Sequence, residues 1–176
     1  MDKAPSKLNT KEYSSFVDES FSWKFIERPG FDKYTADLCR PNTEALDIGS
    51  GDGRICRYLL ERGLQPENVV GIDPDSNFIK LARQKTEGVK FIKAQASNLP
   101  FVNNSFDLVL SNMVLHMMGS DELDQSIKEI SRVLLKGGIF FFVDTNPYQD
   151  LNNLRLNHWV KKQAPWGERL SIFQHD

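Results

Sequence analysis

The feature that most constrains the fold is a glycine-rich segment between a short apolar run and an amphipathic helical pattern. The segment Ala45-Leu-Asp-Ile-Gly-Ser-Gly-Asp-Gly-Arg54 places Gly49, Gly51 and Gly53 at alternate positions. Glycine frees the backbone to turn tightly and lets a ligand approach closely. A strand, a glycine loop and a helix in this order are typical of the first turn of a nucleotide-binding βαβ unit.

The same alternation continues along the chain and predicts the fold class. The strand-like apolar runs cover residues 45–48, 69–72, 89–92, 106–110 and 139–143. Helical stripes over 55–60, 78–82 and 123–134 separate several of them, and Gly137-Gly138 is expected to end the last helix. Strands that alternate with helices form a mainly parallel sheet covered on both faces. We therefore expect an α/β fold with a Rossmann-like doubly wound sheet.

The chain of 176 residues is predicted to be a single domain with three parts. Residues 1–40 carry two helical patterns, broken at Arg28-Pro29-Gly30, and are expected to form an N-terminal helical lid. Residues 41–144 form the core that contains the glycine loop. Residues 145–176 form a C-terminal extension with a helical stretch and one short strand over 169–174.

Charge and composition exclude several kinds of partner. The formal net charge is −2 and no basic stripe is present, so no nucleic acid is expected. The longest apolar run, Ile139 to Val143, is far too short to cross a bilayer, so no membrane partner is expected. Cys39 and Cys56 have neither metal-ligand nor disulfide spacing. We expect a cytoplasmic protein without a bound metal.

An acid follows the glycine loop at the distance expected for a ribose ligand. Asp73 lies 20 residues after Gly53, at the end of the second strand, where its carboxylate can accept both ribose hydroxyls. Asp47 and Asp52 bracket the loop, and their charges oppose a pyrophosphate but suit a cationic amine. S-adenosylmethionine has a ribose, an ammonium group and a sulfonium but no phosphate, so it fits this pattern better than a dinucleotide.

With these residues in place, the sequence resembles the class I S-adenosylmethionine-dependent methyltransferases, in the broad small-molecule group. The resemblance covers roughly residues 40–145 and rests on four segments in order: Asp47-x-Gly-x-Gly-x-Gly53, Val70-Gly-Ile-Asp73-Pro, Asn98-Leu-Pro-Phe101 with Ser105-Phe-Asp-Leu-Val109, and Glu129-Ile-Ser-Arg-Val-Leu-Leu-Lys-Gly-Gly138. It implies S-adenosylmethionine as cofactor, S-adenosylhomocysteine as product, and in-line methyl transfer to a small-molecule acceptor.

The resemblance also implies a role for each matching position of the cofactor site. Asp47 would hold the methionine amine, and Asp73 would bind the ribose. Gln95 stands where the family often has an aspartate, and its amide oxygen would accept from the adenine amine. The other cofactor positions are Gly49, Ser50, Gly51 and Gly53 along the loop, Pro74 and Ala96 against the adenine, and Ser111 beside the methionine end.

The acceptor site is poorly encoded, because methyl transfer from a sulfonium needs alignment and exclusion of water more than a catalytic group. His116 is the candidate base for an acceptor hydroxyl, and the alternative is a wall residue that fixes the next segment. With Asn112 and His116, the aromatic residues Tyr13, Trp23 and Tyr34 make up the predicted acceptor pocket. Plain packing of these aromatic side chains against the core is an equal alternative.

The C-terminal part is shorter than in the resembled family, whose sheet has seven strands. Only 32 residues follow Asp144. The run from Ile139 to Val143 is therefore expected near an open sheet edge, which proteins normally cover. We expect a shortened form of the fold, or a homodimer whose second subunit covers this edge.

Three other functions fit part of the sequence. A non-catalytic S-adenosylmethionine-binding or regulatory module would keep the fold with an incomplete acceptor pocket. A nicotinamide-linked oxidoreductase is disfavoured by the acids and the glycine spacing of the loop. A nucleic-acid methyltransferase is disfavoured by the net charge, and Asn146-Pro147 is interpreted as an ordinary turn.

Overall fold

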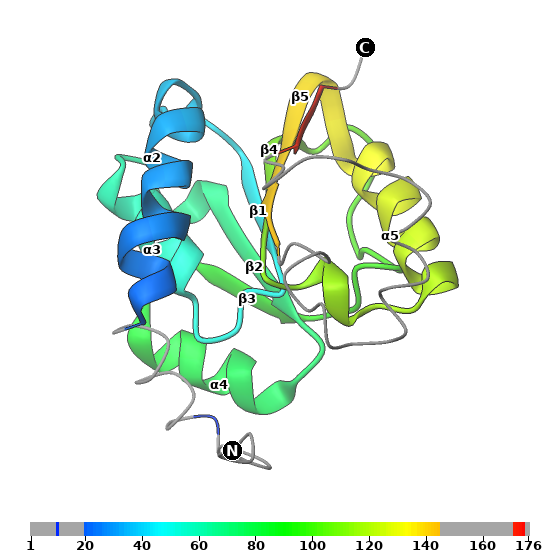
Figure 1. The fold of residues 1–176 in the computed structure, drawn as a ribbon, viewed down its shortest axis with the longest axis horizontal. Coiled ribbons are helices and arrows are strands. Elements are labelled where there is room, and N and C mark those ends of the chain that lie inside the picture. Colours follow the sequence, from blue (N-terminus) through cyan, green and yellow to red (C-terminus); the bar gives the residue numbers. More distant parts are fainter. Residues whose placement is uncertain (1–9, 11–19, 145–170, 175–176) are drawn as a thin grey trace.

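The computed structural model describes residue 10, residues 20–144 and residues 171–174. Within these residues six strands form one sheet in the order β3-β2-β1-β4-β5-β6 (Figure 1). Strands β1 to β5 are parallel, and β6 pairs with β5 in the antiparallel direction. The strands are β1 (Ala45–Ile48), β2 (Val69–Asp73), β3 (Lys90–Lys93), β4 (Phe106–Asn112), β5 (Leu134–Val143) and β6 (Ser171–Gln174).

Helices cover both faces of this sheet, as the Rossmann-like prediction requires. Figure 1 shows α2, α3 and α4 on one side and α5 on the other. These helices are α2 (Arg28–Thr35), α3 (Arg54–Glu61), α4 (Ser76–Lys85) and α5 (Ser120–Val133). Single helical turns are the π turn η1 (Trp23–Glu27) and the 3-10 turns η2 (Ala36–Leu38), η3 (Pro66–Asn68) and η4 (Leu115–Met117). The α/β fold class is confirmed.

The sheet separates two apolar cores, because successive side chains of a strand point to opposite faces. One core gathers Phe31, Tyr58, Leu59, Leu110 and Phe141 beneath α2 and α3, and the other gathers Leu46, Val109, Ile130, Val133 and Phe140 beneath α5. All four residues of β1 are buried, so this central strand is a continuous apolar run rather than an alternating one.

The order of the strands reverses at β1, which lies between β2 and β4. In an open α/β sheet, the connections that leave the carboxyl ends of two such strands diverge toward opposite faces and open a crevice. Ligands bind in this crevice. The glycine loop after β1 therefore lies at the expected ligand-binding edge.

The expected break in the N-terminal helices at Arg28-Pro29-Gly30 is wrong. The π turn η1 runs directly into α2, and the N–H of Arg28 donates to the carbonyl of Trp23. Pro29 lies in the first turn of α2. Proline is tolerated in a first turn because the N–H that it lacks would have no intrahelical partner there.

The continuous N-terminal helix packs along one stripe. Trp23, Glu27, Phe31 and Thr35 recur at every fourth residue, and all four are buried. Residues spaced by four lie on one face of a helix. The segment from Trp23 onward is thus part of the core on the α2 face.

The junction between α5 and β5 also differs from the expectation. The helix ends at Val133, and Leu134 already has extended backbone and begins β5. The expectation that Gly137-Gly138 ends the helix is wrong because Leu134 pairs with Phe106 at the start of β4. Pairing between strands overrides the helical periodicity here.

The edge beside β5 is covered within the chain. Strand β6 pairs with β5 from Ile139 to Phe142, so the expectation of an open edge from Ile139 to Val143 is wrong over these residues. The short strand predicted within 169–174 is confirmed as β6. A homodimer stays a prediction, without this argument from an uncovered edge. In the described part of the chain, no helix has the length and apolar character needed to cross a bilayer.

The buried stripe predicts that the N-terminal helix contributes to stability. Phe31 is fully buried, and its ring centroid lies 5.1 Å from that of Phe141 and 5.6 Å from that of Tyr58. Phe31→Ala should cost about 3–5 kcal/mol in the free energy of unfolding, measured by urea denaturation. Phe25→Ala, at a side chain that is 65% exposed, should cost less than about 1 kcal/mol. Equal small losses would show that the helix is not part of the cooperative core.

Candidate cofactor-binding site

The glycine loop is held in a conformation that other residues rarely adopt. Gly49, Gly51 and Gly53 have φ values of 69°, 52° and 84°. At Gly49 a Cβ atom would lie 2.3 Å from the Val114 side chain, so glycine is required there by packing as well as by φ. At Gly51 a Cβ atom would meet no protein atom within 4 Å. The loop therefore leaves an open space beside Gly51 into which a ligand fits.

Two hydrogen bonds tie this loop to the end of β2. The N–H of Ser50 donates to the carbonyl of Ile72 at 2.8 Å, and the N–H of Gly51 donates to Asp73 Oδ2 at 3.0 Å. The second carboxylate oxygen of Asp73 accepts from the N–H of Asp75 at 2.8 Å. These contacts join the loop to the acid of β2 and fix where the Asp73 carboxylate lies.

The charge on Asp73 is opposed by burial. Desolvation raises the pKa of Asp73, and the two backbone N–H donors partly offset this rise. Each carboxylate oxygen has a second lone-pair position that these two bonds leave available. The geometry is that of a carboxylate poised to accept from neighbouring hydroxyl groups, as the ribose assignment requires.

Asp47 is the most deeply buried acid at this edge. Its side chain is 1% exposed, Oδ2 accepts weakly from Cys56 Sγ at 3.5 Å, and Oδ1 has no partner in the described part of the chain. The pKa of Asp47 is raised to about 7, mainly by burial; the hydrogen bond from the Cys56 thiol opposes this rise, and the nearby charge of Asp73 adds to it. An unpaired buried carboxylate is costly, so this site is built for a cation or a hydrogen-bond donor that the protein itself does not supply.

A cavity of about 220 Å³ lies beside the loop on the α5 side. It is lined by Ile48, Gly49, Ile72, Pro74, Ala94, Gln95, Ala96, Val114, Met117, Met118 and Glu122. Three residues predicted for the adenine, Pro74, Gln95 and Ala96, therefore line one cavity together with Gly49. This largely apolar cavity is of a kind that accepts an aromatic base.

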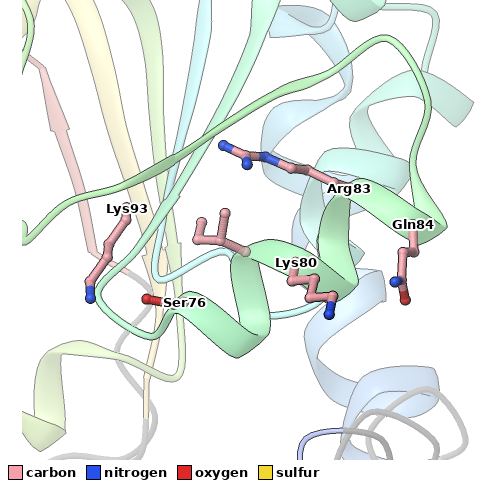
Figure 2. Close-up of a pocket in the computed structure, with 6 residues that line it drawn as sticks. Ser76, Lys80, Arg83, Gln84 and Lys93 are labelled. Carbon is pink, nitrogen blue, oxygen red and sulfur yellow. The ribbon is translucent and has the colours of Figure 1, made fainter.

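A larger depression of about 450 Å³ lies elsewhere, beside α4 and the end of β3 (Figure 2). Figure 2 shows that its labelled residues come from α4 and from the end of β3. They include Lys80, Arg83 and Lys93, which are exposed, and none of the predicted cofactor residues lines it. We therefore assign the cofactor site to the glycine loop rather than to this depression.

The carboxyl end of β4 contributes two buried polar residues. The hydroxyl of Ser111 has no partner in the described residues, and its side chain shares the face of β4 that carries Val109. Asn112 Nδ2 donates to Glu27 Oε2 at 2.7 Å. Glu27 is a site residue that sequence reasoning missed. Its position in the buried stripe of the N-terminal helix, between Trp23 and Phe31, was the available signal.

His116 lies at the surface beyond β4. Its Nδ1 atom contacts Asp144 Oδ1, and its backbone N–H donates to Asp144 Oδ2 at 3.1 Å. Both residues follow the carboxyl ends of neighbouring strands, so Asp144 orients the imidazole ring. The roles of His116 as a base and as a wall residue both remain compatible with this position.

The aromatic residues predicted for the acceptor pocket pack instead against the core. Trp23 is buried, its ring lies 4.5 Å from the Arg54 guanidinium, and it belongs to the core beneath α2 and α3. Tyr34 is half-buried, with its ring stacked at 6.1 Å on Phe141. Tyr13 lies outside the described residues. The packing alternative therefore describes Trp23 and Tyr34 better than the roof of a pocket.

The arrangement fits one class of ligand. An acid at the end of β2, a buried acid in β1 with one oxygen unpartnered among the described residues, and an apolar cavity beside the loop suit a nucleoside with a cationic tail. The two acids beside the glycine loop would repel a pyrophosphate. The fold and the site are those of a class I S-adenosylmethionine-dependent methyltransferase.

Comparison with known proteins gives the same result. The sequence profile of the methyltransferase domain family matches residues 46–142, and the chain belongs to this family. A fatty-acid O-methyltransferase of Mycolicibacterium smegmatis is 32% identical over 108 residues, which are 60% of this chain and 38% of that protein. The ubiquinone/menaquinone biosynthesis C-methyltransferase UbiE of Campylobacter jejuni is 34% identical over 110 residues, or 60% of this chain and 46% of that protein.

A solved structure is similar over more of the chain. The PH0226 protein of Pyrococcus horikoshii OT3 superposes with a TM-score of 0.65 and 28% identity, covering 84% of this chain and 65% of that one. By contrast, this chain matches less than half the length of each of the two curated relatives.

Replacing glycine at two positions separates backbone strain from ligand contact. Gly51 and Gly63 both have positive φ, and a Cβ atom at either would meet no protein atom within 4 Å. Gly51→Ala and Gly63→Ala should therefore each cost about 1–2 kcal/mol in the free energy of unfolding. Only Gly51→Ala should weaken S-adenosylhomocysteine binding in calorimetric titration, because Gly63 follows the end of α3. Equal affinities in the two variants would show that the ligand does not bind at the glycine loop.

Replacing Asp47 by asparagine should stabilise the ligand-free protein and weaken ligand binding. Because the pKa of Asp47 is raised from 3.8 to about 7, ionising it lowers the stability of the folded, ligand-free protein as the pH rises through this range. Asp47→Asn should be more stable than the wild type at pH 8 by up to about 4 kcal/mol, and this advantage should shrink toward pH 4. Urea denaturation at the two pH values measures it. A pH-independent difference would show that the carboxylate is not desolvated.

Proposed function

We propose that this chain transfers the methyl group of S-adenosylmethionine to a small-molecule acceptor. The observation that carries the proposal is the geometry of one sheet edge, where Asp73 is fixed to the N–H of Gly51 and Asp47 is buried with a free acceptor atom. Membership of the methyltransferase domain family supports it. The names of the relatives, a fatty-acid O-methyltransferase and a quinone-pathway C-methyltransferase, support a small organic acceptor.

Each part of the cofactor has a matching group in the chain. Asp73 accepts from the ribose hydroxyls, and Gly49, Ser50, Gly51 and Gly53 let the loop pass close to the ligand. Pro74, Gln95 and Ala96 hold the adenine in the cavity. Asp47 takes the ammonium group, and Ser111 lies beside the methionine end. When bound, S-adenosylmethionine supplies a methyl group already activated by its sulfonium.

The protein's contribution to the reaction is alignment of the acceptor and exclusion of water. Asn112 and His116, at and beyond the end of β4, border the acceptor side in this proposal. With its ring oriented by Asp144, His116 takes a proton from an acceptor that carries a hydroxyl. Tyr13 remains a candidate for this side as well. No metal is required, and the reaction takes place in the cytosol, where two unpaired cysteines stay reduced.

Ligand titration tests the cofactor assignment. The wild-type chain should bind S-adenosylmethionine and S-adenosylhomocysteine with micromolar affinity and should not bind NAD. Asp73→Asn should weaken binding at least about tenfold, because one of the ribose acceptors becomes a donor. Asp107→Asn is a matched control. Asp107 also accepts a backbone N–H, from Glu44, but it lies near the amino-terminal end of β4, at the opposite end of the strands from the glycine loop.

Three results would contradict the proposal. They are NAD binding in place of S-adenosylmethionine, no binding of either ligand by folded protein, and equal losses in the Asp73 and Asp107 variants. Binding without turnover on a panel of hydroxyl, carboxyl, thiol and amine acceptors would favour the alternative of a non-catalytic binding module.

A further inference from the structure

The N-terminal helix places a buried acid, Glu27, at the carboxyl end of β4. Glu27, at the end of η1, is 4% exposed. Its carboxylate accepts from Ser22 Oγ at 2.6 Å and from Asn112 Nδ2 at 2.7 Å, and it pairs with Arg54 Nη2 at 3.4 Å. Glu27 thus joins the N-terminal helix to the end of β4 and to the first residue of α3.

This contact fixes the orientation of the Asn112 amide. An ionised carboxylate can only accept hydrogen bonds, so the amide must turn its NH₂ group toward Glu27. Its oxygen then faces away from Glu27. This oxygen is buried and has no partner among the described residues. Glu27 therefore turns Asn112 into a buried acceptor with an unused lone pair.

The unused acceptor lies on the same face as another one. Asp47 pairs in register with Leu110, and Asn112 lies two residues further along β4. Because alternate residues of a strand share a face, the side chains of Asn112 and Asp47 emerge on the same side of the sheet. Each has a buried oxygen that no described residue contacts with a hydrogen bond, Asn112 Oδ1 and Asp47 Oδ1. Leaving both unsatisfied is unfavourable, and one group with several N–H donors can satisfy both.

Glu27 also forms an ion pair with the guanidinium of Arg54. The guanidinium pairs with Glu27, stacks on the Trp23 ring at 4.5 Å, and is close enough to Asp47 to lower the pKa of that carboxyl. Glu27 therefore contacts both the Asn112 amide and the Arg54 guanidinium.

We propose that Glu27 is a positioning residue for cofactor binding, which fixes the Asn112 amide so that its oxygen, together with Asp47, accepts from the ammonium group of S-adenosylmethionine. This inference rests on the proposed function, because it assigns a further contact to that cofactor. It makes the N-terminal helix a structural part of the cofactor site rather than a separate cover.

Three ligands that differ only in the tail test the assignment. S-adenosylhomocysteine has the ammonium and the carboxylate, decarboxylated S-adenosylhomocysteine keeps the amine alone, and 5′-methylthioadenosine has neither. Calorimetric titration would compare the wild type with Asn112→Ala, Glu27→Ala and Glu27→Gln. Glu61→Gln is the control, since Glu61 is an exposed acid on α3 whose partner is Arg28.

The account predicts a loss confined to ligands that carry the amine. Asn112→Ala and Glu27→Ala should bind S-adenosylhomocysteine and decarboxylated S-adenosylhomocysteine about tenfold or more weakly and 5′-methylthioadenosine as the wild type does. Glu27→Gln keeps a carbonyl oxygen for Asn112 and should lose less than Glu27→Ala. Glu61→Gln should be unchanged with all three ligands.

Other patterns would overturn the assignment. A uniform loss of affinity for all three ligands would show that Glu27 and Asn112 act in folding rather than in binding the amine. A loss with S-adenosylhomocysteine alone would place Asn112 at the carboxylate instead of the amine. Wild-type protein that binds none of the ligands would refute the proposed function itself, whereas wild-type binding with unchanged Asn112 and Glu27 variants would refute only this inference.

Discussion

The hydrogen bond from the N–H of Gly51 to Asp73 is the constraint on which the rest of the site depends. It holds the loop after β1 against the end of β2, and the bond from Ser50 to Ile72 supports it. The loop can follow this path only because its three glycines take positive φ. Fixing the loop also fixes the start of α3, and with it Arg54. This connection therefore fixes Asp73 against the loop, whereas Asp47 is held by the pairing of β1 with β2 and β4.

The site contains buried polar atoms that lack hydrogen-bond partners among the described residues, and a ligand that donates to them would remove this energetic cost. Asp47 is buried without a full set of partners, and the pKa of its carboxyl is raised to about 7. Among the described residues, Asn112 Oδ1 and the hydroxyl of Ser111, at the end of β4, also lack a partner. Such groups are costly in a folded protein and are retained mainly where a ligand completes them. The N-terminal helix adds Glu27, whose charge is balanced by Arg54.

The sheet and the loop could be predicted from the sequence because their signals are local. The apolar run 45–48 is β1 with the same bounds, and the loop and Asp73 meet as the spacing indicated. The failures are also physical. The sequence predicts a break at Pro29, although a first helical turn tolerates proline. The helical periodicity includes Leu134, but this residue pairs with Phe106 in the sheet. Glu27 was missed because its partner Asn112 lies 85 residues away in the sequence.

The most direct test of the account is a crystal structure of the chain with S-adenosylhomocysteine. The account predicts ribose hydroxyls on Asp73, adenine in the cavity lined by Pro74, Gln95 and Ala96, and the ammonium group between Asp47 and Asn112. A ligand bound over α4 among Lys80, Arg83 and Lys93, or a ligand whose amine points away from Asp47, would contradict it.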